Sequence, residues 1–202
     1  MRSSAITTAV LLPCLAWLPC ILAACAGTPA KAPPASNPYV PARDGARDPL
    51  RAQALTLEAV EVMSGDPARA ETLLCEALGA DLWHGPAHNN LGVLYLRQDK
   101  LYEAASEFEW ARKLMPGHPD PRMNLAFVLE RAGRTDEALA TYGTALEVFP
   151  GHMPTMQAMA RLTVREGVED ERLDGWLREI ALQGQTAEWR EWALLEMARR
   201  GS

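Results

Sequence analysis

The chain has 202 residues, of which 48% are hydrophobic and 23% are charged, and this composition is that of a globular protein. Its formal net charge is −6, which has the wrong sign for a nucleic-acid-binding surface and argues against nucleic acid as a partner. A folded region of roughly 150 residues would bury about 68–70% of the surface of its unfolded chain, which is enough for independent stability.

Residues 1–24 have the composition of a lipoprotein signal peptide. Arg2 is followed by a long apolar run without charged residues, which ends at Leu22-Ala23-Ala24-Cys25. That tetrapeptide resembles the bacterial lipobox, and the resemblance implies that Cys25 is acylated and becomes the new N-terminus. The alternative is an uncleaved membrane anchor, since about 20 apolar residues can span a bilayer. Two prolines inside the run and the single suitable cysteine favour cleavage.

Residues 25–48 follow as a tether. This segment is rich in Pro and Ala and lacks the pattern of a helix or a core. After cleavage only Cys25 and Cys75 would remain, and Cys25 would carry lipid, so we expect no disulfide in the mature chain. Cys75 is expected to be a partly buried packing residue.

Three Asp-Pro pairs predict helix starts, because Asp caps a helix N-terminus and Pro suits the first helical position. The sequence therefore predicts helices that begin after the caps Asp48, Asp66 and Asp120.

Residues 85–152 contain nearly the same sequence twice, and corresponding residues are 34 positions apart (125 − 91). A fixed period of this length is typical of helical-repeat arrays, with two helices in each repeat. The corresponding residues are Leu91 and Leu125, Glu103-Ala104 and Glu137-Ala138, Phe108 and Tyr142, Ala111 and Ala145, and Pro116-Gly117-His118 and Pro150-Gly151-His152.

One of these units resembles the tetratricopeptide repeat (TPR). The residues that carry the resemblance are Leu91-Gly92, Tyr95, Ala104, Phe108, Ala111 and Pro116, with His88 in place of the usual leading Trp. The resemblance implies an all-α fold, a right-handed superhelical solenoid of helix-turn-helix repeats. The same register extends outward with weaker matches, as terminal repeats usually show. We expect a TPR domain over 49–202, with four repeats near 51–84, 85–118, 119–152 and 153–186 and a capping helix over 187–200.

No set of residues in the sequence predicts catalysis, a metal site or a cofactor. There is no Gly-rich phosphate loop, no nucleophile elbow and no histidine pair at zinc-helix spacing. His84, His118 and His152 recur at the repeat period, but equivalent positions in stacked repeats are at least about 8–10 Å apart. We therefore expect these histidines to act in turns and helix caps, and we expect the protein not to be an enzyme.

The TPR resemblance implies a protein-binding groove lined by the first helix of each repeat. Carried over by register, the groove residues are Asn89, Val93, Leu96, Arg97, Met123, Phe127, Arg131, Gln157, Arg161 and Arg165. Three of them, Arg97, Arg131 and Arg165, form a periodic basic ladder that could pair with carboxylates of a peptide. The alternative is that each cation only suits the dipole at the end of its own helix. Val93 and Phe127 occupy positions where a clamp for chaperone tails would need polar residues, so that ligand is not supported.

Together these features predict a non-enzymatic scaffold anchored by lipid in a bacterial cell envelope, at the outer membrane and facing the periplasm. Its partner would be a protein or peptide segment of another envelope protein, in a pilus or secretion assembly. Two alternatives stay open. One is a general cell-wall or outer-membrane biogenesis factor, and the other is an envelope enzyme whose site is assembled from scattered residues.

Overall fold

The computed structural model describes residues 47–201, and every regular element in that range is an α-helix. The prediction of an all-α repeat fold is confirmed. The expected signal peptide, the acylated Cys25 and the tether up to residue 46 lie outside the described residues. In the described range, no helix is long and apolar enough to cross a bilayer.

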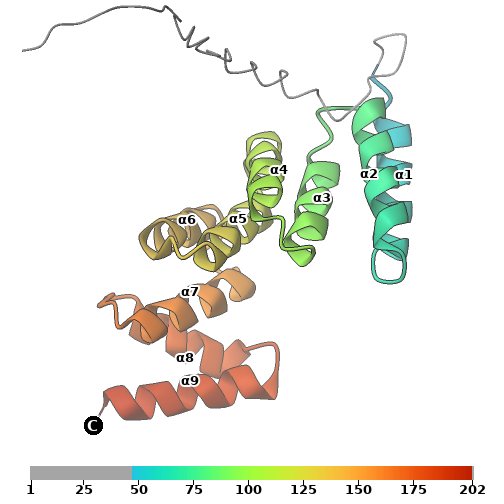
Figure 1. Ribbon diagram of the computed structural model, residues 1–202. Coiled ribbons are helices and arrows are strands. Elements are labelled where there is room, and N and C mark those ends of the chain that lie inside the picture. The colour runs from blue at the N-terminus through green and yellow to red at the C-terminus, as the bar shows by residue number, and fades with distance from the viewer. Residues whose placement is uncertain (1–46, 202) are drawn as a thin grey trace, which may run out of the picture. The chain divides into compact units, whose positions relative to one another are not determined.

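The helices follow one another in chain order, and each packs against the next (Figure 1). The first helices of successive repeats also touch, since α1 contacts α3 and α3 contacts α5. The helices are α1 (Pro49–Val62), α2 (Pro67–Ala80), α3 (Gly85–Arg97), α4 (Leu101–Leu114), α5 (Asp120–Arg131), α6 (Thr135–Val148), α7 (Met153–Glu166), α8 (Leu173–Gln183) and α9 (Ala187–Arg200).

Two of the three predicted aspartate caps are confirmed. The Asp48 side chain accepts a hydrogen bond from the backbone N–H of Arg51, and Asp66 accepts one from Arg69. The prediction for Asp120 is wrong, because α5 already begins at this residue and Pro119 precedes it in helical conformation. A residue inside the first turn can no longer cap it, and Asp120 instead lies 3.2 Å from Nε2 of His152.

Close helix crossings explain the small residues of the repeat. Gly92 on α3 lies against the ring of Phe108 on α4, and a Cβ at Gly92 would be 2.6 Å from the nearest ring atom. One repeat later, Ala126 and Tyr142 occupy the same two positions and both are buried. Large residues thus fill the space that small ones leave on the facing helix.

The fourth repeat departs from this pattern at its second helix. The helices α4 and α6 begin at residues 101 and 135, shortly before Ala104 and Ala138, which are fully buried. Arg172 occupies the corresponding position, and α8 begins only after it. A long cation cannot replace an alanine at a close crossing, so residues 167–172 form a longer connection between α7 and α8.

Candidate protein-interaction surface

The helices α3, α5 and α7 carry all ten residues that the sequence assigned to a groove. On α5, Leu125, Ala126 and Val128 are buried, whereas Phe127 between them is 36% exposed. A large aromatic side chain that stays open beside a packed core is a potential contact for another protein.

The other apolar groove residues are less accessible than Phe127. Val93 and Met123 are half-buried and pack against the core. Leu96 and Gln157 are buried, so their side chains are not available to a partner. Both residues lie on the first helices of their repeats, but the helical register did not show that they are buried.

Asn89 is engaged within the array. Its side-chain oxygen accepts a hydrogen bond from Nδ2 of Asn124 at 3.1 Å, which joins α3 to α5. This polar contact ties two consecutive repeats together on the side where the groove was expected.

The arginine ladder consists of contacts between repeats. Arg131 donates from Nη1 to the backbone carbonyl of Leu96 at 3.2 Å and from Nη2 to the carboxylate of Asp99 at 2.8 Å. Arg97 reaches the carbonyl of Met63 in the same way at 3.5 Å. Each of these arginines extends to the C-terminal end of the first helix of the preceding repeat, where the helix dipole places partial negative charge.

Glu130 pairs with Arg165, the third arginine of the ladder. Its side chain is only 7% exposed and accepts a hydrogen bond from Arg165 at 2.8 Å, while Arg161 lies 3.6 Å away. It also accepts a hydrogen bond from the hydroxyl of Tyr142 at 3.1 Å. Burial, and then the nearby Glu130 carboxylate, raise the pKa of Tyr142 above its ordinary value, so the phenol stays protonated.

The structure also contains a buried polar pair that the sequence analysis did not identify. His88 lies in the position of the missing Trp, and its Nδ1 is 2.6 Å from a carboxylate oxygen of Glu107 on α4. Its Nε2 donates to the carbonyl of Leu82 at 3.0 Å. The ring stacks on Trp110, which in turn meets Trp83 edge-on. The sequence did contain a signal for this pair. His88 is a polar residue at a repeat position that is usually apolar, and Glu107 lies on the second helix of the same repeat.

The predicted role of the periodic histidines is only partly right. His84 and His152 lie in the turns that precede α3 and α7, but neither side chain caps its helix. His152 instead contacts the hydroxyl of Thr155 through Nδ1 at 2.7 Å. In residues 47–201, no three His, Cys, Asp or Glu side chains form a group that could hold a metal ion.

Cys75 is half-buried, as predicted. Burial and the carboxylates of Glu71 and Glu107 raise the pKa of its thiol. Since the thiolate is the reactive form, this environment does not activate the cysteine.

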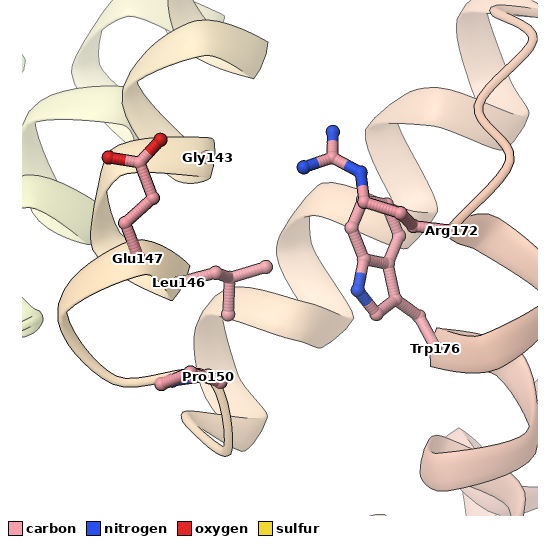
Figure 2. A pocket seen from close by; sticks show the side chains of 6 residues that line it. All are labelled: Gly143, Leu146, Glu147, Pro150, Arg172 and Trp176. Atoms are coloured by element: carbon pink, nitrogen blue, oxygen red, sulfur yellow. The ribbon is translucent and has the colours of Figure 1, made fainter.

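A pocket of about 230 Å³ lies between α6 and the start of α8 (Figure 2). Leu146 and Glu147 face Arg172 and Trp176 across it, and the guanidinium of Arg172 lies 4.9 Å from the centre of the Trp176 ring. Asp170 binds the same guanidinium with both carboxylate oxygens, at 2.8 and 3.0 Å. The Arg172 charge at the edge of the pocket is therefore paired.

Comparisons with known proteins agree with this architecture. A tetratricopeptide-repeat family model matches residues 100–162. No curated protein sequence matches the chain. The first TPR domain of Spaghetti (RPAP3), solved with the HSP90 peptide SRMEEVD, is 17% identical with a TM-score of 0.56, and the match covers 60% of this chain and 97% of that one. MamA is 19% identical with a TM-score of 0.55, over 76% and 82% of the two chains.

A third structural match is an O-GlcNAc transferase mutant from Thermobaculum terrenum, which is 24% identical with a TM-score of 0.60. The match covers 67% of this chain but only 27% of the transferase, so it concerns a fraction of that enzyme. At these identities the likeness shows the fold alone. The chain is an α-helical repeat protein with the TPR fold. The family model supports the TPR resemblance of the sequence over residues 100–162.

Proposed function

We propose that the protein is a non-enzymatic scaffold that binds a peptide segment of another protein along α3, α5 and α7. The TPR fold supports this proposal, because proteins with this fold commonly act as protein-interaction scaffolds. The similar RPAP3 domain was solved with a bound HSP90 peptide, so at least one protein of this fold binds a peptide segment.

The exposed ring of Phe127 is the observation that carries the proposal. It projects from α5, where Leu125, Ala126 and Val128 are buried, and the half-buried Met123 lies one turn before it. Aromatic side chains dominate interface energies when a partner covers them. The ladder arginines are engaged with the preceding repeats, so we infer that recognition depends on an apolar anchor more than on a carboxylate clamp.

We further propose that lipid on Cys25 holds this scaffold in a bacterial cell envelope, at the outer membrane. The support for this step is the lipobox-like sequence before Cys25 and the Pro-rich tether after it. An envelope protein of a pilus or secretion assembly is the proposed partner. A general role in cell-wall or outer-membrane biogenesis is the alternative, and a screen for hydrolysis of wall or glycan substrates would reveal an enzyme.

Crosslinking followed by recovery of the full chain from intact membranes tests the proposal. We expect Phe127→Ala to reduce recovery of the specific partner about thirtyfold, because truncating an apolar anchor typically costs about 2 kcal/mol. Phe149→Ala is the matched control, since Phe149 is also exposed (52%) but lies in the turn after α6. Equal recovery with Phe127→Ala and the wild type, with the fold intact by circular dichroism, would exclude this surface as the binding site.

A further inference from the structure

Two exposed tryptophans lie next to each other near the turn between α2 and α3. Trp83 belongs to this turn and is 51% exposed, and Trp110 on α4 is 40% exposed. Their rings meet edge-on with their centroids 6.2 Å apart. Tryptophan side chains are highly buried on average, so two adjacent open rings are a candidate contact surface. We call these two residues the tryptophan pair.

Contacts behind the rings hold the tryptophan pair in place. The buried ring of His88 stacks on Trp110 with the centroids 5.8 Å apart, and Nδ1 of His88 lies 2.6 Å from a carboxylate oxygen of Glu107. The backbone N–H of Trp83 donates to the carboxylate of Asp81 at 3.1 Å. A surface that is fixed before binding loses little conformational freedom when it is covered.

The first described residues of the chain are fastened beside the tryptophan pair. Arg47 binds both carboxylate oxygens of the buried Asp81, at 2.8 and 3.0 Å. The backbone N–H of Asp48 donates to the carbonyl of Ala80 at 2.9 Å. Asp81 lies only two residues before Trp83. The segment that ends at Arg47 therefore joins the domain next to the two open rings.

This preceding segment contains a sequence that suits an aromatic surface. Residues 37–41 read Asn-Pro-Tyr-Val-Pro, with Pro38 and Pro41 three positions apart. Prolines at this spacing favour the polyproline II helix, and such segments dock on surfaces lined by aromatic rings. The six residues from Pro41 to Arg47 span at most about 20 Å when extended, so the prolines can reach the tryptophan pair.

We propose that Pro38 and Pro41 dock on the tryptophan pair of their own chain. A polyproline II helix repeats every three residues, so both prolines lie on the same side and each can meet one ring. Its backbone carbonyls make no internal hydrogen bonds. The ammonium of Lys113, which lies 5.7 Å from the centre of the Trp110 ring, can donate to one of them. Because the segment belongs to the same chain, its effective concentration is high and a weak contact suffices.

Docking would shorten the tether between the lipid and the domain. From Cys25 to Arg47 there are 22 steps along the chain (47 − 25), which reach about 70 Å when extended. From Cys25 to Asn37 there are 12 (37 − 25), which reach about 40 Å. The scaffold would then stay closer to the membrane. This consequence rests on the proposed lipid anchor, whereas the docking itself involves neither the lipid nor Phe127.

Limited digestion of the purified full chain with trypsin, in a nonionic detergent, tests the docking. Trypsin can cleave after Arg43, two residues beyond Pro41, and after Lys31, which lies outside the proposed contact. We expect Trp83→Ala to speed cleavage after Arg43 about tenfold and to leave cleavage after Lys31 unchanged. The reason is that loss of one aromatic contact shifts the docking equilibrium by about this factor, and cleavage follows the undocked population.

Phe149→Ala is the matched control for Trp83→Ala, because Phe149 is 52% exposed and lies in the turn after α6. It should leave both cleavage rates unchanged, and circular dichroism checks that both variants keep their helices. Equal cleavage after Arg43 in Trp83→Ala and in the wild type would overturn the proposal. So would an equal increase after Arg43 and after Lys31.

Substitutions in the proline segment test the same contact without changing any described residue. With 5-fluorotryptophan incorporated, the fluorine NMR resonances of the tryptophan pair should shift in Pro38→Ala/Pro41→Ala and should not shift in the control Pro33→Ala/Pro34→Ala. Unchanged resonances in the first variant, or equal shifts in both, would overturn the proposal. If the difference from the wild type vanished on dilution, the segment would dock on a second copy, and docking within one chain would be wrong.

Discussion

The guanidinium of Arg131 and the backbone carbonyl of Leu96 are joined by a hydrogen bond of 3.2 Å that links the ends of α5 and α3. The contact places a cation at the C-terminal end of α3, beside a carbonyl that also accepts a hydrogen bond from the backbone N–H of Asp99. The Asp99 carboxylate binds the same guanidinium. The periodic arginines thus connect each repeat to the preceding one. This role does not require a ligand.

Arg131→Ala should destabilise the protein by about 1 kcal/mol, because it removes one charge-assisted hydrogen bond and one exposed ion pair. Urea denaturation followed by circular dichroism measures the free energy of unfolding. Arg178→Ala, an exposed arginine on α8, is the control and should change it by less than about 0.5 kcal/mol. Equal stability of Arg131→Ala and the wild type would show that the ladder is not structural.

Gly92→Ala should destabilise the protein by about 1–3 kcal/mol through overpacking. A new Cβ would be 2.6 Å from the Phe108 ring, which is itself fully buried and cannot move away freely. Thermal and urea denaturation both report this change.

Gly143→Ala is the matched control for the glycine prediction. Gly143 lies inside α6, and a Cβ added there would meet no atom within 4 Å outside its own helix backbone. The substitution should therefore stabilise the helix by about 0.5–1 kcal/mol, since glycine is unfavourable in a helix interior. If Gly92→Ala and Gly143→Ala changed the free energy of unfolding equally, α3 and α4 would not approach each other closely at Gly92.

Arg47→Leu should lower stability at neutral pH and lose its effect in acid. Arg47 binds both carboxylate oxygens of the buried Asp81, at 2.8 and 3.0 Å, and this contact lowers the pKa of Asp81 below its ordinary value of 3.8. A lowered pKa in the folded state contributes stability that is fully present above the pKa of the unfolded chain. That contribution is lost as the pH falls through the lowered pKa of the folded state.

The measurement for this prediction is the free energy of unfolding of the wild type and of Arg47→Leu, at neutral pH and at about pH 2. The difference between the two proteins should be present at neutral pH and should shrink in acid as Asp81 becomes protonated. A difference that is constant over this range would mean that the ion pair does not stabilise the fold.

Cys25→Ala should abolish the incorporation of labelled fatty acid and leave an uncleaved or soluble precursor. We expect this result because the lipobox cysteine is the proposed site of acylation. Incorporation is measured by growing cells with labelled palmitate and recovering the protein. Cys75→Ser is the control and should keep the label, because Cys75 lies in α2. A wild-type protein that takes up no label would contradict the lipid anchor.

Much of the fold could be predicted because the same residue pattern occurs in two consecutive repeats. Leu91 and Leu125, or Phe108 and Tyr142, carry the same spacing in two units, and that spacing alone indicates helices that cross closely. The sequence predicted that α5 begins after Asp120, whereas the helix begins at Asp120 itself. An Asp-Pro pair does not show whether the Asp lies just before the helix or in its first turn. The late start of α8 was missed, although Arg172 in place of an alanine was a visible departure.

The candidate site was predicted less well than the fold. Helical register places ten residues on the first helices, but it does not show which of them a neighbouring helix covers. Phe127 is open while Leu96 and Gln157 are buried, and this difference arises from the packing of α3, α5 and α7 against other parts of the array.

The sequence by itself determined the helical class, the repeat period and the positions of the small residues, because these depend on contacts that recur at fixed spacing along the chain. Only the tertiary structure decided what the arginines do. Arg131 reaches a carbonyl and Arg165 reaches the carboxylate of Glu130, both one repeat earlier in the chain. The same residue type at the same position can bind a partner or its own fold. The choice depends on which acceptor lies within hydrogen-bonding distance, and that distance is set when the repeats stack.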